Sequence, residues 1–338
     1  MMKKNILFVC ALILLSACTG KGGRGTGVTY TAFGKEVSLQ SVKHDVPPVS
    51  LYPRNMFLAD SFLVVYNDKM DTLFQVFDKT TFDYKYGFGI TGGGPNDFNT
   101  LSTYWVSSDG KKCVMQDMQS LREVTIENGH PVIKSRMIPA QQSVYNGMVQ
   151  LEDSVLLCDA DMDKNEVFMF IYPNGETKNW GSYPESAERF GGDLAALKDA
   201  YTGYTVASPK GDRFASFYAY LRQFRIFNSK GELLKAVTLN IDPCDAQVSA
   251  DPEKRCIYPI AVYATDNYIY TLNLDMTAQE IGELKHFPSI QVFTWEGEPV
   301  AKYNLDCMIS CFTIDEAAKC IYGMFVENEH TIYTFQMN

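Results

Sequence analysis

The side chains that most often carry catalysis are sparse in this sequence. Its four histidines, His44, His130, His286 and His330, fall in separate predicted loops, and none belongs to an HExxH or a Cys/His metal pattern. A catalytic triad can be assembled from positions far apart in a chain, but nothing local marks one here. The sequence therefore predicts no catalytic residue, no metal site and no cofactor.

One segment carries oxygen side chains at alternate positions. Residues Asp159–Asn165 match the first half of a calcium-binding loop, in which aspartate and asparagine ligands have this spacing. The match then fails, because Lys164 stands at the sharp-turn glycine and Phe170 at the closing bidentate glutamate. We therefore expect an acidic turn between two strands.

A glycine-rich segment, Gly87–Phe98, has the composition of a phosphate-binding loop but not its context. Such a loop opens a helix, whereas Pro95 and the hydroxyl-rich stretch Thr100–Tyr104 lead into a predicted strand. We expect a turn between two repeats whose backbone conformation is restricted, with Phe98 packed between the two repeats. The formal charge of −10, without any run of basic residues, also argues against a nucleic-acid partner.

Aromatic and guanidinium side chains are the strongest candidates for ligand binding. Tyrosine rings beside arginine suit a carbohydrate or a peptide, through stacking and hydrogen bonds, although tyrosine on a strand is also ordinary sheet packing. The candidate pocket-lining residues are Arg54, Tyr104, Tyr145, Tyr204, Tyr220 and Arg222.

The elements that must position these residues follow a pattern that recurs six times. Each copy begins with two apolar, alternating strands joined by a tight turn of Asp, Asn, Gly or Ser, as in Met56–Tyr66. A third strand, a second turn and a fourth strand follow. Four antiparallel strands repeated at intervals of about 50 residues predict an all-β, six-bladed β-propeller of four-stranded antiparallel blades. The competing architecture is one long two-sheet sandwich or two such sandwiches.

The sixth copy ends early, because Thr331–Phe335 is its third strand and the chain stops at Asn338. A missing outer strand would leave an unpaired edge. We expect an N-terminal strand, either Val28–Phe33 or Val37–Leu39, to supply it and close the ring.

The register of the repeats also predicts two unlike faces. Turns within the first and second hairpins lie on one face, and the remaining connections lie on the other. All the long segments fall on that second face: Gly87–Ser102, Gly181–Gly203, Asn240–Pro259 and Asp275–Lys285. We call it the long-loop face. Long loops on a rigid scaffold often carry function, although insertions are also tolerated there.

The N-terminus carries a targeting signal. Lys3 and Lys4 precede the apolar run Ile6–Leu15, which is too short to span a bilayer and so indicates a cleaved signal. The following Leu15-Ser16-Ala17-Cys18 resembles the lipobox of bacterial lipoproteins, and this resemblance implies cleavage before Cys18 and its acylation. We expect a signal peptide at 1–17, a flexible tether at 18–27 and one propeller domain at 28–338. Cys244 and Cys256 share one long predicted loop, and both the bridged and the unbridged form are compatible with the sequence.

The segment Gly87–Phe98, together with the lipobox and the blade pattern, resembles the TolB-like six-bladed propeller lipoproteins of Bacteroidetes. Many of these carry a G-x-G-P-x-E-F segment after the first blade, and Asp97 here takes the acidic position. The resemblance covers nearly the whole mature chain and implies a fold and a compartment, but no reaction.

The leading hypothesis is a cell-envelope lipoprotein of the outer membrane, periplasmic or surface-exposed, anchored to the membrane through lipid on Cys18. Its long-loop face would recognise a glycan, a peptide or a partner protein. The alternative is a propeller-type enzyme acting on glycans, a hydrolase or lyase, which would need two acidic side chains converging in the pocket. A purely structural envelope protein is the third reading.

Overall fold

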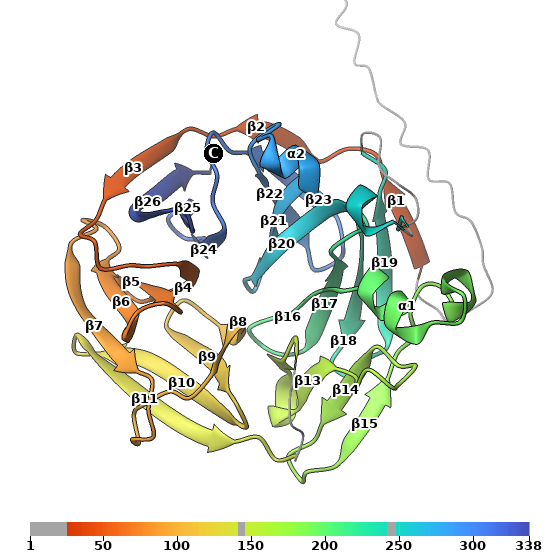
Figure 1. The fold of residues 1–338 in the computed structure, drawn as a ribbon, viewed down its shortest axis with the longest axis horizontal. Helices are drawn as coiled ribbons and strands as arrows, with labels where there is room; N and C mark the ends of the chain where they lie inside the picture. The colour runs from red at the N-terminus through yellow and green to blue at the C-terminus, as the bar shows by residue number, and fades with distance from the viewer. Residues whose placement is uncertain (1–25, 141–145, 242–247, 250, 338) are drawn as a thin grey trace, which may run out of the picture.

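Six small, mostly antiparallel sheets surround a central axis in the computed structural model, which describes residues 26–140, 146–241, 248–249 and 251–337 (Figure 1). The predicted six-bladed propeller is confirmed, and the sandwich alternatives are wrong. The predicted signal peptide, Cys18, Tyr145 and Cys244 lie outside the described residues. Among the described residues, no helix has the length and apolar character needed to cross a membrane.

In each blade the strands follow one another from the axis outward. Blade 1 contains β4 (Pro53–Ala59), β5 (Phe62–Asn67), β6 (Thr72–Asp78) and β7 (Tyr84–Ile90), and blade 2 contains β8 (Leu101–Ser108), β9 (Lys112–Asp117), β10 (Ser120–Glu127) and β11 (His130–Met137). Blade 3 contains β12 (Val149–Gln150), β13 (Leu156–Asp159), β14 (Phe168–Ile171) and β15 (Thr177–Trp180), and blade 4 contains β16 (Gly203–Ala207), β17 (Arg213–Tyr218), β18 (Gln223–Asn228) and β19 (Leu233–Leu239). Blade 5 contains β20 (Cys256–Ala264), β21 (Tyr268–Thr277), β22 (Ser289–Thr294) and β23 (Pro299–Asn304), and blade 6 begins with β24 (Cys311–Asp315), β25 (Cys320–Phe325) and β26 (Asn328–Gln336).

The hairpin turns use the residues that the sequence pattern singled out. Asp60 connects β4 to β5 with φ at 54°, in the left-handed region that aspartate tolerates. Asn128 and Gly129 connect β10 to β11 with φ at 53° and 78°, the pair of positive values that a two-residue hairpin requires. These turns fix the register of each blade.

The blades are held together by apolar side chains that alternate along each inner strand. On β4, Phe57 faces blade 2 and packs in one cluster with Met115, whereas Met56 faces blade 6 and packs with Met324. All four side chains are fully buried. Because successive side chains of a strand point to opposite faces, both faces of an inner strand are covered by neighbouring blades.

The N-terminal segment closes the ring, but not with the strand expected. Strand β3 (Ser41–Asp45) pairs antiparallel with β26 and completes blade 6. Strand β1 (Thr26–Tyr30) instead adds to blade 4, parallel to β19, and β2 (Lys35–Ser38) adds to blade 5, parallel to β23. The expectation for Val28–Phe33 or Val37–Leu39 was wrong, and two blades have five strands rather than four. Since β1 starts at Thr26, the last two residues of the predicted tether are strand.

The polarity of the three segments explains this choice. The outermost strand of a blade faces solvent, so the polar β3 suits the sixth blade's edge. There the His44 ring stacks on Phe82, with ring centroids 3.8 Å apart, and its Nε2 lies 2.9 Å from Thr334 Oγ1. The more apolar segments pack over blades 4 and 5, where Val28 and Phe33 join one cluster and Val37 joins another.

Both α-helices lie on the face turned toward the viewer in Figure 1, where they cover parts of blades 4 and 5. Helix α1 (Leu194–Ala200) is capped by Asp193, whose carboxylate accepts hydrogen bonds from the backbone of Ala195 and Ala196. Helix α2 (Ala278–Gly282) begins with a reciprocal capping box between Thr277 and Glu280. Three short 3₁₀ turns complete the fold: η1 (Glu152–Ser154), η2 (Ala187–Phe190) and η3 (Pro252–Lys254).

Candidate functional site

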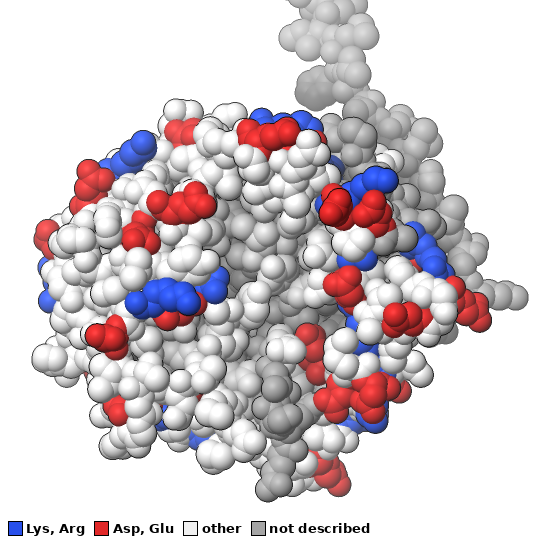
Figure 2. Space-filling model, viewed as in Figure 1, with Lys and Arg blue, Asp and Glu red and all other residues white. Residues whose placement is uncertain are grey.

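A cavity of about 720 Å³ occupies the axis of the propeller. The innermost strand of every blade contributes to its wall: β4, β8, β12, β16, β20 and β24. The wall also includes Asp159, Ala219 and Tyr220, which stand at the connections on the long-loop face. Figure 2 shows the molecule hollowed at its centre on the face that carries the two helices. We call this cavity the channel.

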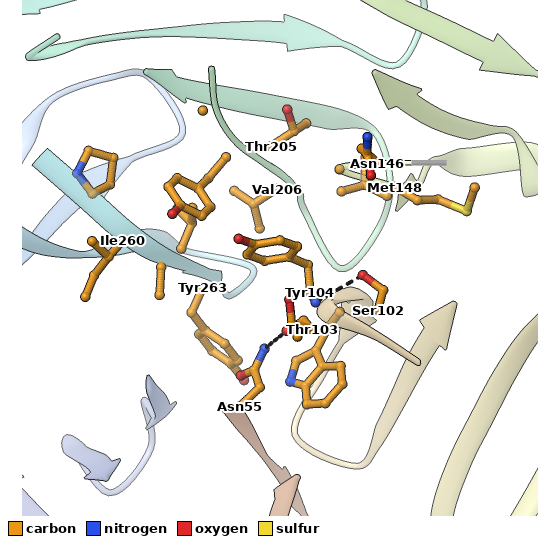
Figure 3. Close-up of a pocket in the computed structure, with 18 of the residues that line it drawn as sticks. Asn55, Ser102, Thr103, Tyr104, Asn146, Met148, Thr205, Val206, Ile260 and Tyr263 are labelled. Atoms are coloured by element: carbon orange, nitrogen blue, oxygen red, sulfur yellow. Dashed lines mark hydrogen bonds between the residues drawn. The ribbon is translucent and has the colours of Figure 1, made fainter. Parts of the chain in front are cut away.

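Tyrosines and hydroxyl groups give the channel its chemical character. Tyr104 is 49% exposed and lines the channel (Figure 3). Its ring meets that of Tyr204 at 67° with centroids 5.6 Å apart. Burial, followed by the proximity of Tyr104, raises the pKa of Tyr204, so this hydroxyl stays protonated at neutral pH and can donate. The other hydroxyl-bearing residues of the wall are Ser102, Thr103, Ser107, Ser108, Thr202, Thr205, Tyr220, Tyr263 and Ser310.

The backbone of β8 turns Tyr104 toward the channel. Pairing between β8 and β9 is irregular on both sides of Trp105, which indicates bulges in the inner strand. Trp105 points the other way, into the contact with blade 1, and its indole donates to Met56 O at 3.2 Å. The side chain of Asn55 donates to Thr103 O at 2.9 Å and ties blade 1 to this stretch. The irregular strand therefore presents its aromatic side chain from a fixed base.

Arg54 lines the channel with its charge already neutralised. Its Nε donates to Asp68 Oδ2 at 2.7 Å, and its guanidinium lies over the Tyr52 ring, 4.6 Å from the centroid. The hydrogen bond that Arg54 donates to Asp68 stabilises the protonated form and raises the pKa of Arg54. This side chain is a paired surface group at the rim of the wall.

Tyr220 also lines the channel and is supported from behind by Arg255. The Arg255 guanidinium lies 5.1 Å from the Tyr220 centroid. It also contacts Asp199 at 2.6 Å and donates to Ser249 O at 3.0 Å. One buried arginine thus joins helix α1, the loop before β20 and the channel wall. No local sequence pattern points to Arg255, because the segments that it connects are far apart in the chain.

Two predicted pocket residues have other outcomes. Arg222 is absent from the channel wall: it is mostly buried beside Asp275, 3.7 Å away, and stacks on Tyr258 at 5.1 Å. Its position at the β17–β18 turn suggested the channel, but the side chain points between blades 4 and 5. Tyr145 lies outside the described residues. The structure thus places Arg54, Tyr104, Tyr204 and Tyr220 around the channel.

Asp159 also lines the channel, although in the sequence it stands out only as part of a calcium-like pattern. It ends β13, its side chain is accessible from the channel, and its backbone N–H donates to Asn146 O at 2.9 Å. Burial among surrounding protein atoms raises the pKa of its carboxyl to about 6, although nearby Lys198 opposes the shift.

The turn after Asp159 is not arranged for a metal ion. Lys198, on α1, inserts its ammonium there and donates to Asp161 O at 2.8 Å, with Ala160 O at 3.5 Å. Across residues 26–140, 146–241, 248–249 and 251–337, no group of three or more His, Cys, Asp or Glu side chains is placed to hold a metal. An acidic turn, as expected, occupies this position.

The glycine-rich segment is a structural connection between blades 1 and 2. The Asp97 carboxylate folds back to accept from Gly94 N at 2.8 Å, and Phe98 is buried in the cluster between the two blades. Arg122 donates to Asp97 O at 2.9 Å and pairs with buried Asp117 at 3.0 Å. The expected packing of Phe98 between the blades is confirmed.

Comparisons with known proteins agree with this architecture. A family model described as TolB-like 6-blade propeller-like matches residues 32–317. A search of curated proteins gives no match. Among solved structures, a protein of Bacteroides fragilis NCTC 9343 described as exported is 12% identical, with a TM-score of 0.54 over 93% of this chain and 100% of that one. A DUF4221 family member from Bacteroides vulgatus ATCC 8482 is 11% identical, with a TM-score of 0.57 over 89% and 97%. At these identities the likeness concerns the fold alone.

Proposed function

Because the chain belongs to the TolB-like six-bladed propeller family, we propose that it is a cell-envelope lipoprotein that binds a short glycan in its channel without transforming it. The observation that carries this proposal is the wall of the channel, which combines tyrosine rings and many hydroxyl groups with a single carboxylate among the described lining residues.

The envelope location is supported by the N-terminal sequence. Lys3, Lys4, the apolar run and Cys18 have the order of a lipoprotein signal, and a distant structural neighbour is described as exported. A lipid on Cys18 would be only eight residues from the start of β1, a reach of at most about 28 Å. We propose an outer-membrane anchor that keeps the propeller close to the lipid surface.

The channel suits a saccharide in size and chemistry. A volume of about 720 Å³ lies within the range of about 300–1,000 Å³ typical of small-molecule sites. Tyr104 and Tyr204 offer ring faces for the apolar sides of sugar rings, and the neighbouring hydroxyls both donate and accept hydrogen bonds. Neutral, versatile hydrogen-bonding groups of this kind match a polyhydroxylated ligand.

The same wall argues against a glycoside hydrolase. Such enzymes generally place two carboxyl groups roughly 5 to 9.5 Å apart, one as acid and the other as nucleophile or base. Among the described lining residues, Asp159 is the one carboxylate, so the second partner is missing from that part of the chain. This favours binding over hydrolysis.

A glycan array probed with the full-length protein tests the proposal. We expect selective binding that weakens about tenfold, about 1.4 kcal/mol, in Tyr104→Ala and Tyr204→Ala. Tyr84→Ala, on the outer strand β7, is the control and should bind as the unmodified protein does. Absence of binding across the array, or equal losses in all three variants, would contradict a glycan site in the channel.

A further inference from the structure

The two charged side chains of the channel wall differ in whether an oppositely charged group lies beside them. Among the described lining residues, Arg54 is the one basic side chain and Asp159 is the one carboxylate. Arg54 is neutralised by Asp68 at 2.7 Å. Asp159 has no hydrogen bond or ion pair from its carboxylate to any residue that the structure describes. Among the described lining residues, Asp159 is therefore the one charge without a hydrogen bond or close ion pair, and it is negative.

The nearest cation does not supply the missing partner. Lys198 exerts an electrostatic pull on Asp159, but its ammonium is engaged by the carbonyl oxygens of Asp161 and Ala160 and forms no ion pair with the carboxylate within 4.0 Å. Its buried side chain also passes the Tyr183 ring, 5.9 Å from the centroid. Lys198 is therefore held on the protein side of the turn, and the channel side of Asp159 is left open.

The Asp159 carboxylate is exposed to the channel, but the protein wall around it partly desolvates the charged form. Its surroundings disfavour the charged form, as the raised pKa of about 6 reflects. A cation brought into the channel would recover the missing interaction and would be less screened there than at the surface. An ammonium group donates three hydrogen bonds, and nearby tyrosine rings favour it through their π faces.

Resting on the proposed glycan-binding function, we propose that the channel selects an amino-bearing saccharide, whose primary ammonium group pairs with the Asp159 carboxylate while its hydroxyls meet the tyrosines and serines of the wall. Asp159 is then the residue that sets specificity, and Tyr104 and Tyr204 supply general sugar affinity. A neutral or acidic sugar of the same shape lacks the paired charge and binds more weakly.

Calorimetric titration of the full-length protein at pH 6.5, where a large share of the glucosamine amines is protonated and most of the Asp159 carboxyl is ionised, tests this with two matched probes. A glucosamine tetramer and its N-acetylated counterpart share one sugar skeleton. The first carries ammonium groups where the second carries neutral acetamide groups. We expect the glucosamine tetramer to bind at least about tenfold more tightly, and Asp159→Asn to remove that preference. Asp163→Asn removes one exposed carboxylate from the same turn and should leave the preference intact, which controls for net charge.

The outcomes separate this inference from the proposed function. If both tetramers bind equally, or if Asp159→Asn keeps the preference, the ammonium assignment fails while glycan binding stands. If neither tetramer binds but a lysine-containing tripeptide binds in an Asp159-dependent way, the saccharide class is wrong and the proposed function falls with it. Circular dichroism of each variant verifies that the fold is retained.

Discussion

Asp117 and Asp159 occupy the same place in neighbouring blades and have opposite surroundings. Each is the last residue of the second strand, β9 in blade 2 and β13 in blade 3. The Asp117 side chain is 0% exposed and fully engaged: Arg122 pairs with it at 3.0 Å, and Asn99 N and Thr100 N each donate at 2.9 Å. Asp159 is accessible from the channel and has no such partner among the described residues.

The difference shows what a carboxylate does at each site. Three partners surround Asp117, and through Arg122 it also holds the glycine-rich connection at Asp97 O and Pro95 O, so it has no capacity left for a ligand. The Asp159 carboxylate makes no such contact with a described residue, so in our proposal it keeps its capacity for a ligand. A satisfied buried charge indicates structure, whereas an unsatisfied one facing a cavity indicates binding.

The largest effect that we predict is on the Asp117 side of the comparison. Arg122→Ala leaves Asp117 charged and buried, and also frees two carbonyl oxygens of the glycine-rich connection. We expect the free energy of unfolding to fall by about 3–5 kcal/mol in chemical denaturation. Lys112→Ala removes only the half-exposed pair with Glu123, so its loss should stay below about 1 kcal/mol. Similar losses in the two variants would contradict a structural role specific to Asp117.

A smaller loss is expected from the cation behind Asp159. Lys198→Met keeps the apolar stem but removes the donor to Asp161 O, so stability should fall by about 2 kcal/mol. Removing this positive charge also withdraws the one electrostatic interaction that favours ionised Asp159, so its pKa should rise further. Thermal unfolding and the pH profile of ligand binding are the two readouts. An unchanged pH profile would show that Lys198 does not influence Asp159.

Asp159→Asn should have the opposite sign from Arg122→Ala. Replacing an unpaired carboxylate by a neutral isostere relieves its desolvation, and solvent in the channel screens part of that cost. We expect a gain of about 1 kcal/mol in unfolding free energy at pH 7.5, together with loss of the ammonium ligand. A clear loss of stability would mean that Asp159 has a structural partner, as Asp117 does.

The smallest predicted effect is the pH dependence of the stability that Asp159→Asn gains. The native-state pKa of Asp159 is raised to about 6, above its ordinary value, so the native state binds a proton more tightly than the unfolded state. The contribution of Asp159 to the free energy of unfolding therefore becomes more favourable as the pH falls through 6 toward 4, and less favourable as the pH rises. Among the described residues, the titratable groups that interact with Asp159 are Lys198 on α1, Tyr183 and the neighbouring Cys158. The stability difference between Asp159→Asn and the unmodified protein should shrink between pH 7.5 and pH 5.

The sequence predicted the architecture well because turns and alternation are local. Turn residues such as Asp60 and Asn128-Gly129 indicate hairpins from the local sequence. Six such repeats in register leave few alternatives to a ring of blades. The closing strand was misplaced because apolar content suggested Val28–Phe33, whereas an outer edge accepts the polar β3. Such choices depend on which surface is left uncovered, and that is a property of the assembled ring.

The channel was only partly visible in the sequence. Tyr104 and Tyr204 could be placed near the axis from strand order alone. Arg222 could not be, because the direction of a side chain at a turn depends on its neighbours, here Tyr258 and Asp275. The pairing of Asp117 with Arg122 and the isolation of Asp159 leave no trace in the local sequence, since both depend on contacts between segments.

Site-resolved NMR titration of the aspartate carboxyl groups in full-length protein tests the central claim most directly, with the Asp159 signal assigned from the Asp159→Asn spectrum. We predict that Asp159 titrates near pH 6 in the free protein and that its pKa falls when the glucosamine tetramer is added. An ordinary aspartate pKa that does not move with the ligand would contradict an unpaired carboxylate awaiting a cation.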